Sequence, residues 1–257
     1  MFTAYFDAAG KSSRPGLLSI AGFVSDDRKW GRFEIEWLKI LHRESISRFH
    51  MTDFASSQGE FKNWNGQTDR RKTLIADLLH CAKKFTNKAF GGAVVIRDYD
   101  EVNKDFELQR FAGHHYPLCA HYCVHLVQLW QKRHSIKEVQ FVFEKGDEHK
   151  GELERLCKAD GIAPHFRGKE AIQFQAADLV AWRTRDAFEN AFKLGLNNER
   201  VNLLHKSFSE ARSGPHQAFF GNRVSLVQFC IERSIPRRGP MKNSCASRTP
   251  SDDGAAP

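Results

Sequence analysis

Apolar and polar positions in the first hundred residues predict three strands. Residues 2–7, 17–24 and 90–96 are rich in aromatic and branched aliphatic side chains, and polar or turn-forming residues bound them. The small and polar stretch 8–16 separates the first two, which we interpret as an antiparallel hairpin. The Val-Val-Ile run of the third strand indicates burial.

A helical segment over about residues 26–86 separates the second strand from the third. It opens with an apolar stripe at helical spacing, for which Asp26 or Asp27 is a suitable N-cap. Residues 45–67 show no regular pattern, and a second helix starts at Thr68. The apolar positions are Trp30, Phe33, Trp37, Ile40 and Leu41 in the first helix and Leu74, Ile75, Leu78 and Leu79 in the second.

The second half of the chain alternates helices with short strands, and no internal repeat is visible. We expect helices over about 113–134, 148–159 and 171–193, strands over 139–143 and near 162–166, and helical segments at both ends of 200–232.

This order of elements predicts a single mixed α/β domain over residues 1–235, with helices flanking a sheet and a helical insertion after the second strand. It is compatible with a ribonuclease-H-like sheet, whose first three strands are antiparallel and whose later strands alternate with helices. From residue 236 onward proline is frequent and large apolar side chains are almost absent, so we expect a disordered tail over 236–257.

The composition is typical of a folded chain. Of 257 residues, 41% are hydrophobic and 27% are charged, which excludes a wholly disordered, collagenous or coiled-coil protein. No apolar run approaches the ~20 residues of a membrane helix, and the N-terminus does not resemble a secretion signal. The six cysteines are scattered along the chain without the spacing of a disulfide framework. This pattern suits free thiols in a reducing cytoplasm.

The formal net charge of +8 is compatible with a nucleic-acid partner. A basic balance is weak support by itself, because many basic proteins bind no polyanion.

Four acidic residues stand where the ligands of a metal site would be expected. Asp7 and Glu144 end strands, Asp147 follows beyond a glycine, and Asp178 lies in an otherwise apolar helix. Burying such charges is costly unless they are paired or bind a cation. Mg²⁺ and Mn²⁺ prefer oxygen ligands, and two such ions about 3.5–4 Å apart promote phosphodiester cleavage.

Each acid also has a purely structural interpretation. The alternatives are a turn cap for Asp7, an ion pair with Lys145 or Lys150 for Glu144, a helix N-cap for Asp147, and, for Asp178, an ion pair with Arg183 or Arg185 or hydrogen bonds to the backbone.

Two further residues, His50 and Asp53, lie three positions apart and could share a helical face or meet in a turn. His50 is a candidate general base or substrate contact. The alternative is a surface histidine beside an aspartate that caps a helix.

The predicted helix 113–134 carries Cys119 with Cys123 and His121 with His125, each pair spaced i, i+4. The two pairs lie about 200° apart around the helix and cannot form one zinc site. We therefore interpret the two thiols as small buried groups. Motifs of nucleophilic hydrolases, P-loop proteins and dinucleotide-binding proteins are absent from the sequence.

Four segments resemble the signature stretches of domain-of-unknown-function family 3800, which is bacterial and phage-borne. They occur in the family's order over about residues 2–190 and read AYFDAAG, RFHMTDF, QFVFEKGDE and IQFQAADLVAW. The resemblance implies a ribonuclease-H-like fold, metal-dependent nuclease activity and a role in phage or mobile-element defence.

The resemblance also implies roles for particular residues. Asp7, Asp178 and either Glu144 or Asp147 would hold Mg²⁺ or Mn²⁺. The accessory site residues would be His50 and Asp53.

The sequence departs from the expected pattern at two places. The glutamate that follows the first aspartate in the family is Ala8 here. The ribonuclease-H pattern also has an acid on the helix before the fourth strand, where this chain has His114 and His115, with Glu107 upstream.

The sequence therefore predicts divalent-metal-dependent hydrolysis of DNA or RNA. The alternative is a catalytically inactive ribonuclease-H-like module that binds nucleic acid or protein, and a third interpretation is a regulatory protein that binds no nucleic acid. The choice of DNA or RNA, the mode of cleavage and the oligomeric state stay open.

Overall fold

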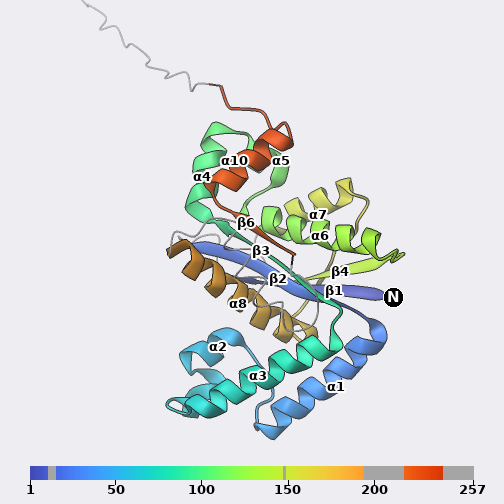
Figure 1. The fold of residues 1–257 in the computed structure, drawn as a ribbon, viewed down its shortest axis with the longest axis vertical. Helices are drawn as coiled ribbons and strands as arrows, with labels where there is room; N and C mark the ends of the chain where they lie inside the picture. Colours follow the sequence, from blue (N-terminus) through green and yellow to red (C-terminus); the bar gives the residue numbers. More distant parts are fainter. Residues whose placement is uncertain (11–15, 147–148, 194–216, 240–257) are drawn as a thin grey trace, which may run out of the picture.

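The computed structural model describes residues 1–10, 16–146, 149–193 and 217–239, and it is built on a six-stranded sheet (Figure 1). The strand order across the sheet is β5-β4-β1-β2-β3-β6. The strands are β1 (Phe2–Ala9), β2 (Leu17–Asp26), β3 (Lys88–Val95), β4 (Val139–Glu144), β5 (His165–Arg167) and β6 (Gln217–Gly221).

The strand directions define a ribonuclease-H-like sheet. β2 is antiparallel to both β1 and β3, whereas β4 is parallel to β1 and β5 is parallel to β4. Three antiparallel strands are thus followed by strands that return parallel to the first through helical connections. β6 extends the sheet beyond β3, parallel to it. The fold class predicted from the sequence is confirmed.

Helices cover both faces of this sheet (Figure 1). α6 (His115–Arg133) and α7 (Lys150–Ala159) pack on one face, and α8 (Ile172–Lys193) packs on the other. The insertion lies on the α8 side and consists of α1 (Asp27–Arg43), α2 (Met51–Ser56), η1 (Gly59–Trp64) and α3 (Thr68–Phe85).

Alternate residues of β1 serve two separate cores, as the two-residue period of a strand requires. Phe6 belongs to the cluster under α6, and Tyr5 belongs to the aromatic cluster shared by α8 and the insertion. Odd-numbered positions of β1, Asp7 among them, therefore face α8.

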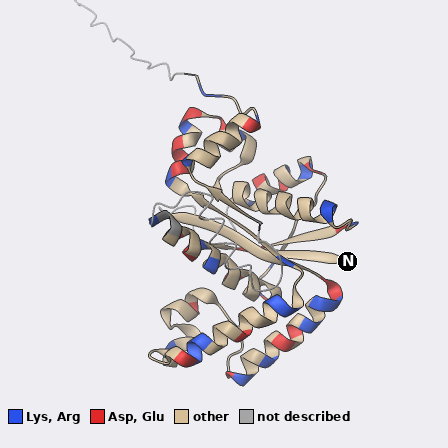
Figure 2. Ribbon diagram, in the orientation of Figure 1, with Lys and Arg blue, Asp and Glu red and all other residues tan. Residues whose placement is uncertain are grey.

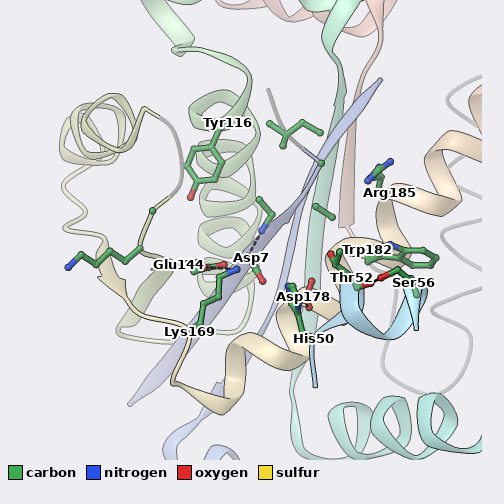
Figure 3. A pocket seen from close by; sticks show the side chains of 17 residues that line it. Asp7, His50, Thr52, Ser56, Tyr116, Glu144, Lys169, Asp178, Trp182 and Arg185 are labelled. Carbon is green, nitrogen blue, oxygen red and sulfur yellow. Dashed lines mark hydrogen bonds and ion pairs between the residues drawn. The ribbon is translucent and has the colours of Figure 1, made fainter. Parts of the chain in front are cut away.

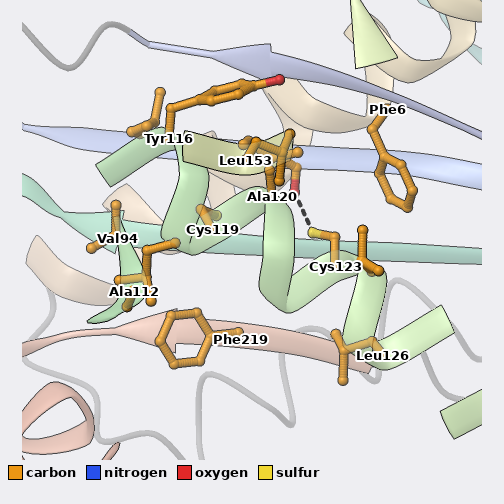
Figure 4. Packing of buried hydrophobic residues seen from close by; sticks show 14 of the residues in the cluster. Phe6, Val94, Ala112, Tyr116, Cys119, Ala120, Cys123, Leu126, Leu153 and Phe219 are labelled. Atoms are coloured by element: carbon orange, nitrogen blue, oxygen red, sulfur yellow. Dashed lines mark hydrogen bonds between the residues drawn. The ribbon is translucent and has the colours of Figure 1, made fainter. Parts of the chain in front are cut away.

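The cluster under α6 also contains the two cysteines of that helix (Figure 4). Cys119 and Cys123 are fully buried, and the Cys123 thiol donates to the Ile20 carbonyl oxygen at 3.6 Å. Burial raises the pKa of Cys123. The interpretation of these residues as small buried groups is confirmed.

The first helix of the insertion forms as its pattern predicts. Asp26 is its N-cap, and the Asp26 side chain accepts a hydrogen bond from the Lys29 backbone N–H at 3.0 Å. The apolar stripe packs inward, and its buried residues are Trp30, Phe33, Trp37 and Leu41.

Several short elements differ from the sequence expectation. The stretch 45–67 contains α2 and η1, which are too short to show a helical period. α4 (Ile96–Asp105) and α5 (Leu108–Ala112) fill the connection before α6, where we predicted no element. α10 (Arg223–Glu232) confirms the helix at the end of 200–232, but β6 precedes it as a strand. The other expected helical end of that region lies in 194–216, outside the described residues.

The predicted tail begins at Pro236, yet residues 236–239 lie against the domain. The Pro236 carbonyl accepts from the Glu107 N–H at 2.9 Å, and Arg237 forms a β-bridge with Phe106. Backbone pairing of this kind needs no apolar side chains, which is why composition did not reveal it. The rest of the predicted tail, 240–257, lies outside the described residues.

Basic and acidic side chains are mixed along the helices of the insertion (Figure 2). In the described part of the chain, none of the helices combines the length and apolar character that crossing a bilayer requires.

Candidate functional site

Asp7 and Glu144 lie side by side at the carboxyl ends of two adjacent parallel strands. β1 pairs with β4 in a register that matches Phe6 with Phe143, so the next residues of the two strands are neighbours. Val142 belongs to the α8-side cluster, and by the same alternation Glu144 faces α8 as Asp7 does. Each carboxylate residue is only 7% exposed.

The third carboxylate, that of Asp178, comes from α8, which packs across β1 and β2. Asp178 is 8% exposed and its Oδ2 accepts a hydrogen bond from the Met51 backbone N–H at 2.7 Å. Of the two structural alternatives for Asp178, the hydrogen bond to the backbone is thus present, whereas Arg185 pairs with Glu189 at 2.8 Å. The insertion therefore supplies part of the site.

Burial raises the pKa of two of these carboxyl groups, Asp7 and Asp178. Burial raises the pKa of Asp7 well above its usual value, and a hydrogen bond with Glu144 and the charges of Glu144 and Asp178 raise it further. Burial also raises the pKa of Asp178. The three carboxylates are thus close enough for like charges to repel one another when no cation is bound.

Lys169 is the cation that faces this cluster, from the loop between β5 and α8. Its Nζ lies 3.0 Å from Glu144 Oε1, so Glu144 pairs with neither Lys145 nor Lys150 (Figure 3). Burial lowers the pKa of Lys169, but the hydrogen bond and charge of Glu144 outweigh this effect and raise it overall. No local sequence pattern indicated Lys169, because its position depends on the course of a loop.

The predicted pair His50 and Asp53 is present at the start of α2. His50 is the N-cap residue of this helix, and its Nδ1 lies 3.1 Å from Asp53 Oδ2. Its Nε2 is 4.0 Å from Asp178 Oδ2. The structure thus brings His50 to the rim of the carboxylate cavity, and Asp53 contacts its ring from behind rather than capping the helix.

The three carboxylates lie in an open cavity of about 970 Å³ (Figure 3). Basic, aromatic and hydroxyl side chains complete its wall, and several of these were not singled out from the sequence. They are Thr52, Ser56, Tyr116, Lys145, Lys169, Trp182 and Arg185.

The two departures from the expected pattern have structural counterparts. Ala8 packs on the α6-side cluster. A longer side chain at position 8 would therefore leave the sheet on the face opposite to the one that carries Asp7. Near the start of α6, Tyr116 reaches the cavity, whereas His114 pairs with Glu152 and His115 with Asp100. Among the described residues that line the cavity, the acids are Asp7, Glu144 and Asp178. Asp147 lies outside the described residues.

A buried glutamine of α8 positions the histidine loop. Gln175 Oε1 accepts from the Trp37 indole N–H at 3.0 Å and from the Phe49 backbone N–H at 2.9 Å. Phe49 directly precedes His50, so this side chain fixes the loop beside the carboxylates. Gln175 is a polar residue within the apolar segment of α8, as Asp178 is, and this pattern could have indicated its role.

Comparison with solved structures returns ribonucleases H. A chain of the PCNA:RNase HII complex from Archaeoglobus fulgidus is 17% identical with a TM-score of 0.40, covering 97% of this chain and 98% of that one. Bst-RNase HIII in complex with Mn²⁺ is 12% identical with a TM-score of 0.43, covering 83% and 63%. Ribonuclease H2 from Pyrococcus horikoshii OT3 is 15% identical with a TM-score of 0.40, covering 91% and 98%.

No model of a known protein family matches the sequence, and no curated protein matches it either. The fold assignment rests on the order and direction of the strands, and the site has to be argued from its own residues.

Proposed function

We propose that this protein is a divalent-metal-dependent nuclease that hydrolyses phosphodiester bonds of DNA or RNA. The observation that carries the proposal is the convergence of Asp7, Glu144 and Asp178, three buried carboxylates from two strand ends and a helix, in one open cavity. A single lysine partner leaves this cluster with an excess of negative charge once it is ionised. Its oxygen donors suit Mg²⁺ or Mn²⁺.

In this proposal the three carboxylates hold the ion, which supplies Lewis-acid polarisation of the phosphodiester and activation of water. Binding of a cation would offset the repulsion between the Asp7 and Glu144 carboxylates.

The neighbouring residues have roles that follow from their positions. Asp53 orients the His50 ring, whose Nε2 faces the carboxylates and accepts a proton from the attacking water. Lys145, Lys169 and Arg185 line the cavity and would bind the phosphate backbone of the substrate. Asp147 stays a candidate ligand on the sequence pattern alone.

We further propose that the chain belongs to domain-of-unknown-function family 3800, on the four segments quoted above. That membership would carry the bacterial or phage origin and a role in defence. The described cysteines are free and buried, which suits a reducing compartment such as the cytoplasm.

A second candidate function is a binding module without catalysis. Two observations favour it: the cavity is lined by three described acids, with alanine at position 8, and the Lys169 ammonium already neutralises one of them. Such a protein would bind nucleic acid with a salt-dependent affinity but would not cleave it.

The deciding experiment is calorimetric titration of Mn²⁺ and Mg²⁺ into the wild type and Asp178→Asn, with cleavage of labelled single- and double-stranded DNA and RNA. Asp186→Asn is the matched control, because Asp186 is exposed on the same helix. The nuclease proposal expects metal binding and cleavage in the wild type and the control, and loss of both in Asp178→Asn. Binding of nucleic acid without cleavage under any metal condition would favour the binding module.

A further inference from the structure

A second group of possible metal ligands lies at the starts of α6 and α7. His114 is the N-cap residue of α6, His149 is the N-cap residue of α7, and Glu152 lies in the first turn of α7. Their donor atoms all lie within 4.8 Å of one another. None of the three lines the cavity of the carboxylate cluster, so this group is distinct from the site proposed above.

Glu152 is the centre of the group. Its Oε1 lies 2.7 Å from His114 Nδ1 and 3.9 Å from His149 Nδ1. Its other oxygen, Oε2, accepts from the His114 backbone N–H at 2.8 Å. The Glu152 carboxylate, in the first turn of α7, thus holds the N-cap residue of α6, which lies 38 positions earlier in the chain.

The two imidazole rings lie face to face, with centroids 3.7 Å apart and an interplanar angle of 6°. The stacking brings one ring from the start of each helix beside a single carboxylate, with the donor atoms of all three residues within 4.8 Å of one another. Neutral imidazole is the form of histidine that binds a metal ion.

The backbone at His149 is held in an unusual conformation. Its φ of 61° and ψ of 29° are left-handed, a region in which non-glycine residues are uncommon. Such conformations gather at ligand clamps and other functional sites. Here the left-handed residue carries one of the three donors.

The ring of His114 is also fixed from behind. Its Nε2 lies 2.9 Å from the Gln109 side-chain amide, and the Gln109 backbone N–H is in turn held by the Asn103 side chain at 2.9 Å. Because the amide group of a glutamine can turn by 180°, it can accept from Nε2–H when Nδ1 is used for a metal. Outer partners of this kind set the orientation of metal-binding histidines.

We propose that His114, His149 and Glu152 form a second metal site that binds Zn²⁺ or a similar transition-metal ion. Two imidazoles and one carboxylate are a zinc donor set that leaves a fourth position for water. Nitrogen donors distinguish this site from the all-oxygen carboxylate cluster, which suits Mg²⁺ or Mn²⁺. Glu152 also offsets the partial positive charge that the two helix N-termini direct at the bound cation.

A metal here would fasten the start of α6 to the start of α7. His149 lies three positions after Gly146, and Gly146 and Lys145 line the carboxylate cavity. The ion would thereby stabilise one wall of that cavity without taking part in its chemistry. The inference concerns metal binding and does not depend on the protein being a nuclease.

The test is a titration of Zn²⁺ into full-length protein that has been stripped of metal and then saturated with Mg²⁺. The variants are Glu152→Gln and His149→Asn; asparagine tolerates the left-handed backbone of position 149. His80→Asn, an exposed histidine on α3, is the matched control. Asp178→Asn reports on the other site, and circular dichroism verifies that each variant is folded.

We expect one Zn²⁺ per chain in the wild type, His80→Asn and Asp178→Asn. The Zn²⁺ affinity should fall by more than ~10-fold in Glu152→Gln and His149→Asn. Loss of a residue that only hydrogen-bonds to a metal ligand already lowers metal affinity by about that much. Co²⁺ in place of Zn²⁺ should give the visible absorption of a four-coordinate site that disappears in the same two variants. Unchanged Zn²⁺ affinity in folded Glu152→Gln and His149→Asn, or binding lost only in Asp178→Asn, would overturn the proposal.

Discussion

Asp7 and Glu144 lie side by side at the ends of adjacent parallel strands, and both are buried. The contact holds two groups of like charge together, which costs free energy once both are ionised. A site that binds a cation has to accept this cost in its metal-free form, and the cost can be measured.

We expect Asp7→Asn to stabilise the metal-free protein at pH 7. The folded-state pKa of Asp7 is raised, so its contribution to stability is present below its unfolded pKa and is lost as pH rises through the folded value. Asparagine does not ionise, so the variant does not carry this loss. Urea unfolding in EDTA should therefore show a gain in stability at pH 7, which shrinks towards acid pH.

The same variant should lose the stabilisation that Mn²⁺ gives to the wild type, because a ligand has been removed. Asp186→Asn, exposed on α8, should behave as the wild type in both buffers. A metal-free Asp7→Asn protein that is less stable than the wild type at pH 7 would contradict this account of the site.

Lys169→Met should have opposite effects on metal binding and on cleavage. The ammonium lies 3.0 Å from Glu144 and competes with a cation for that carboxylate. Lys169 is about half exposed, so solvent screens the repulsion between its ammonium and the ion. Removing the ammonium should stabilise bound Mn²⁺ by only ~1 kcal/mol, which corresponds to about five-fold tighter binding. Cleavage should fall, since a phosphate contact is lost. Lys150→Met, which breaks an exposed pair with Glu154, is the control.

Titration calorimetry and steady-state kinetics separate the two effects of Lys169→Met. If metal affinity and cleavage both fall, Lys169 supports the fold of the site rather than balancing its charge.

Gln175→Leu should destabilise the fold by about 2–4 kcal/mol, because the Trp37 and Phe49 N–H groups would lose their acceptor in a buried position. Gln228→Leu on α10 removes only an exposed contact with Glu232 and should cost little. Urea unfolding measures both. Equal stability of the two variants would show that the Gln175 contacts are dispensable.

His50→Ala should lower the cleavage rate by about 100-fold or more if His50 is the general base. Asp53→Asn should lower it less, because it removes only the group that orients the ring. Single-turnover rates at saturating Mn²⁺ measure the chemical step. A His50→Ala enzyme with the wild-type rate would remove this residue from the mechanism.

The sheet and the long helices could be predicted because their residues repeat with a clear period. The helical period holds over several turns in the apolar stripe from Trp30 to Leu41. The strand pattern holds over several residues in the run from Phe90 to Val95. α2 and β6 each span six residues or fewer, which is too short for a period to stand out. Their conformation is decided by the surfaces on which they pack.

The meeting of Asp7 and Glu144 was foreseeable for a related reason. Strand ends are fixed by the sheet, so acids at the ends of neighbouring parallel strands have to meet. Lys169 and Tyr116 reach the same cavity from a loop and from the first turn of α6, and no local pattern encodes where those elements lie.

The hydrogen bond from the Met51 N–H to Asp178 couples the insertion to the sheet. With Gln175 joining the same loop to α8, the helices between β2 and β3 cannot open while the carboxylates stay in place. The amide proton of Met51 should then exchange with deuterium only when the whole domain unfolds. A shortened protein without these helices would lose both the contact that holds Asp178 and the loop that carries His50.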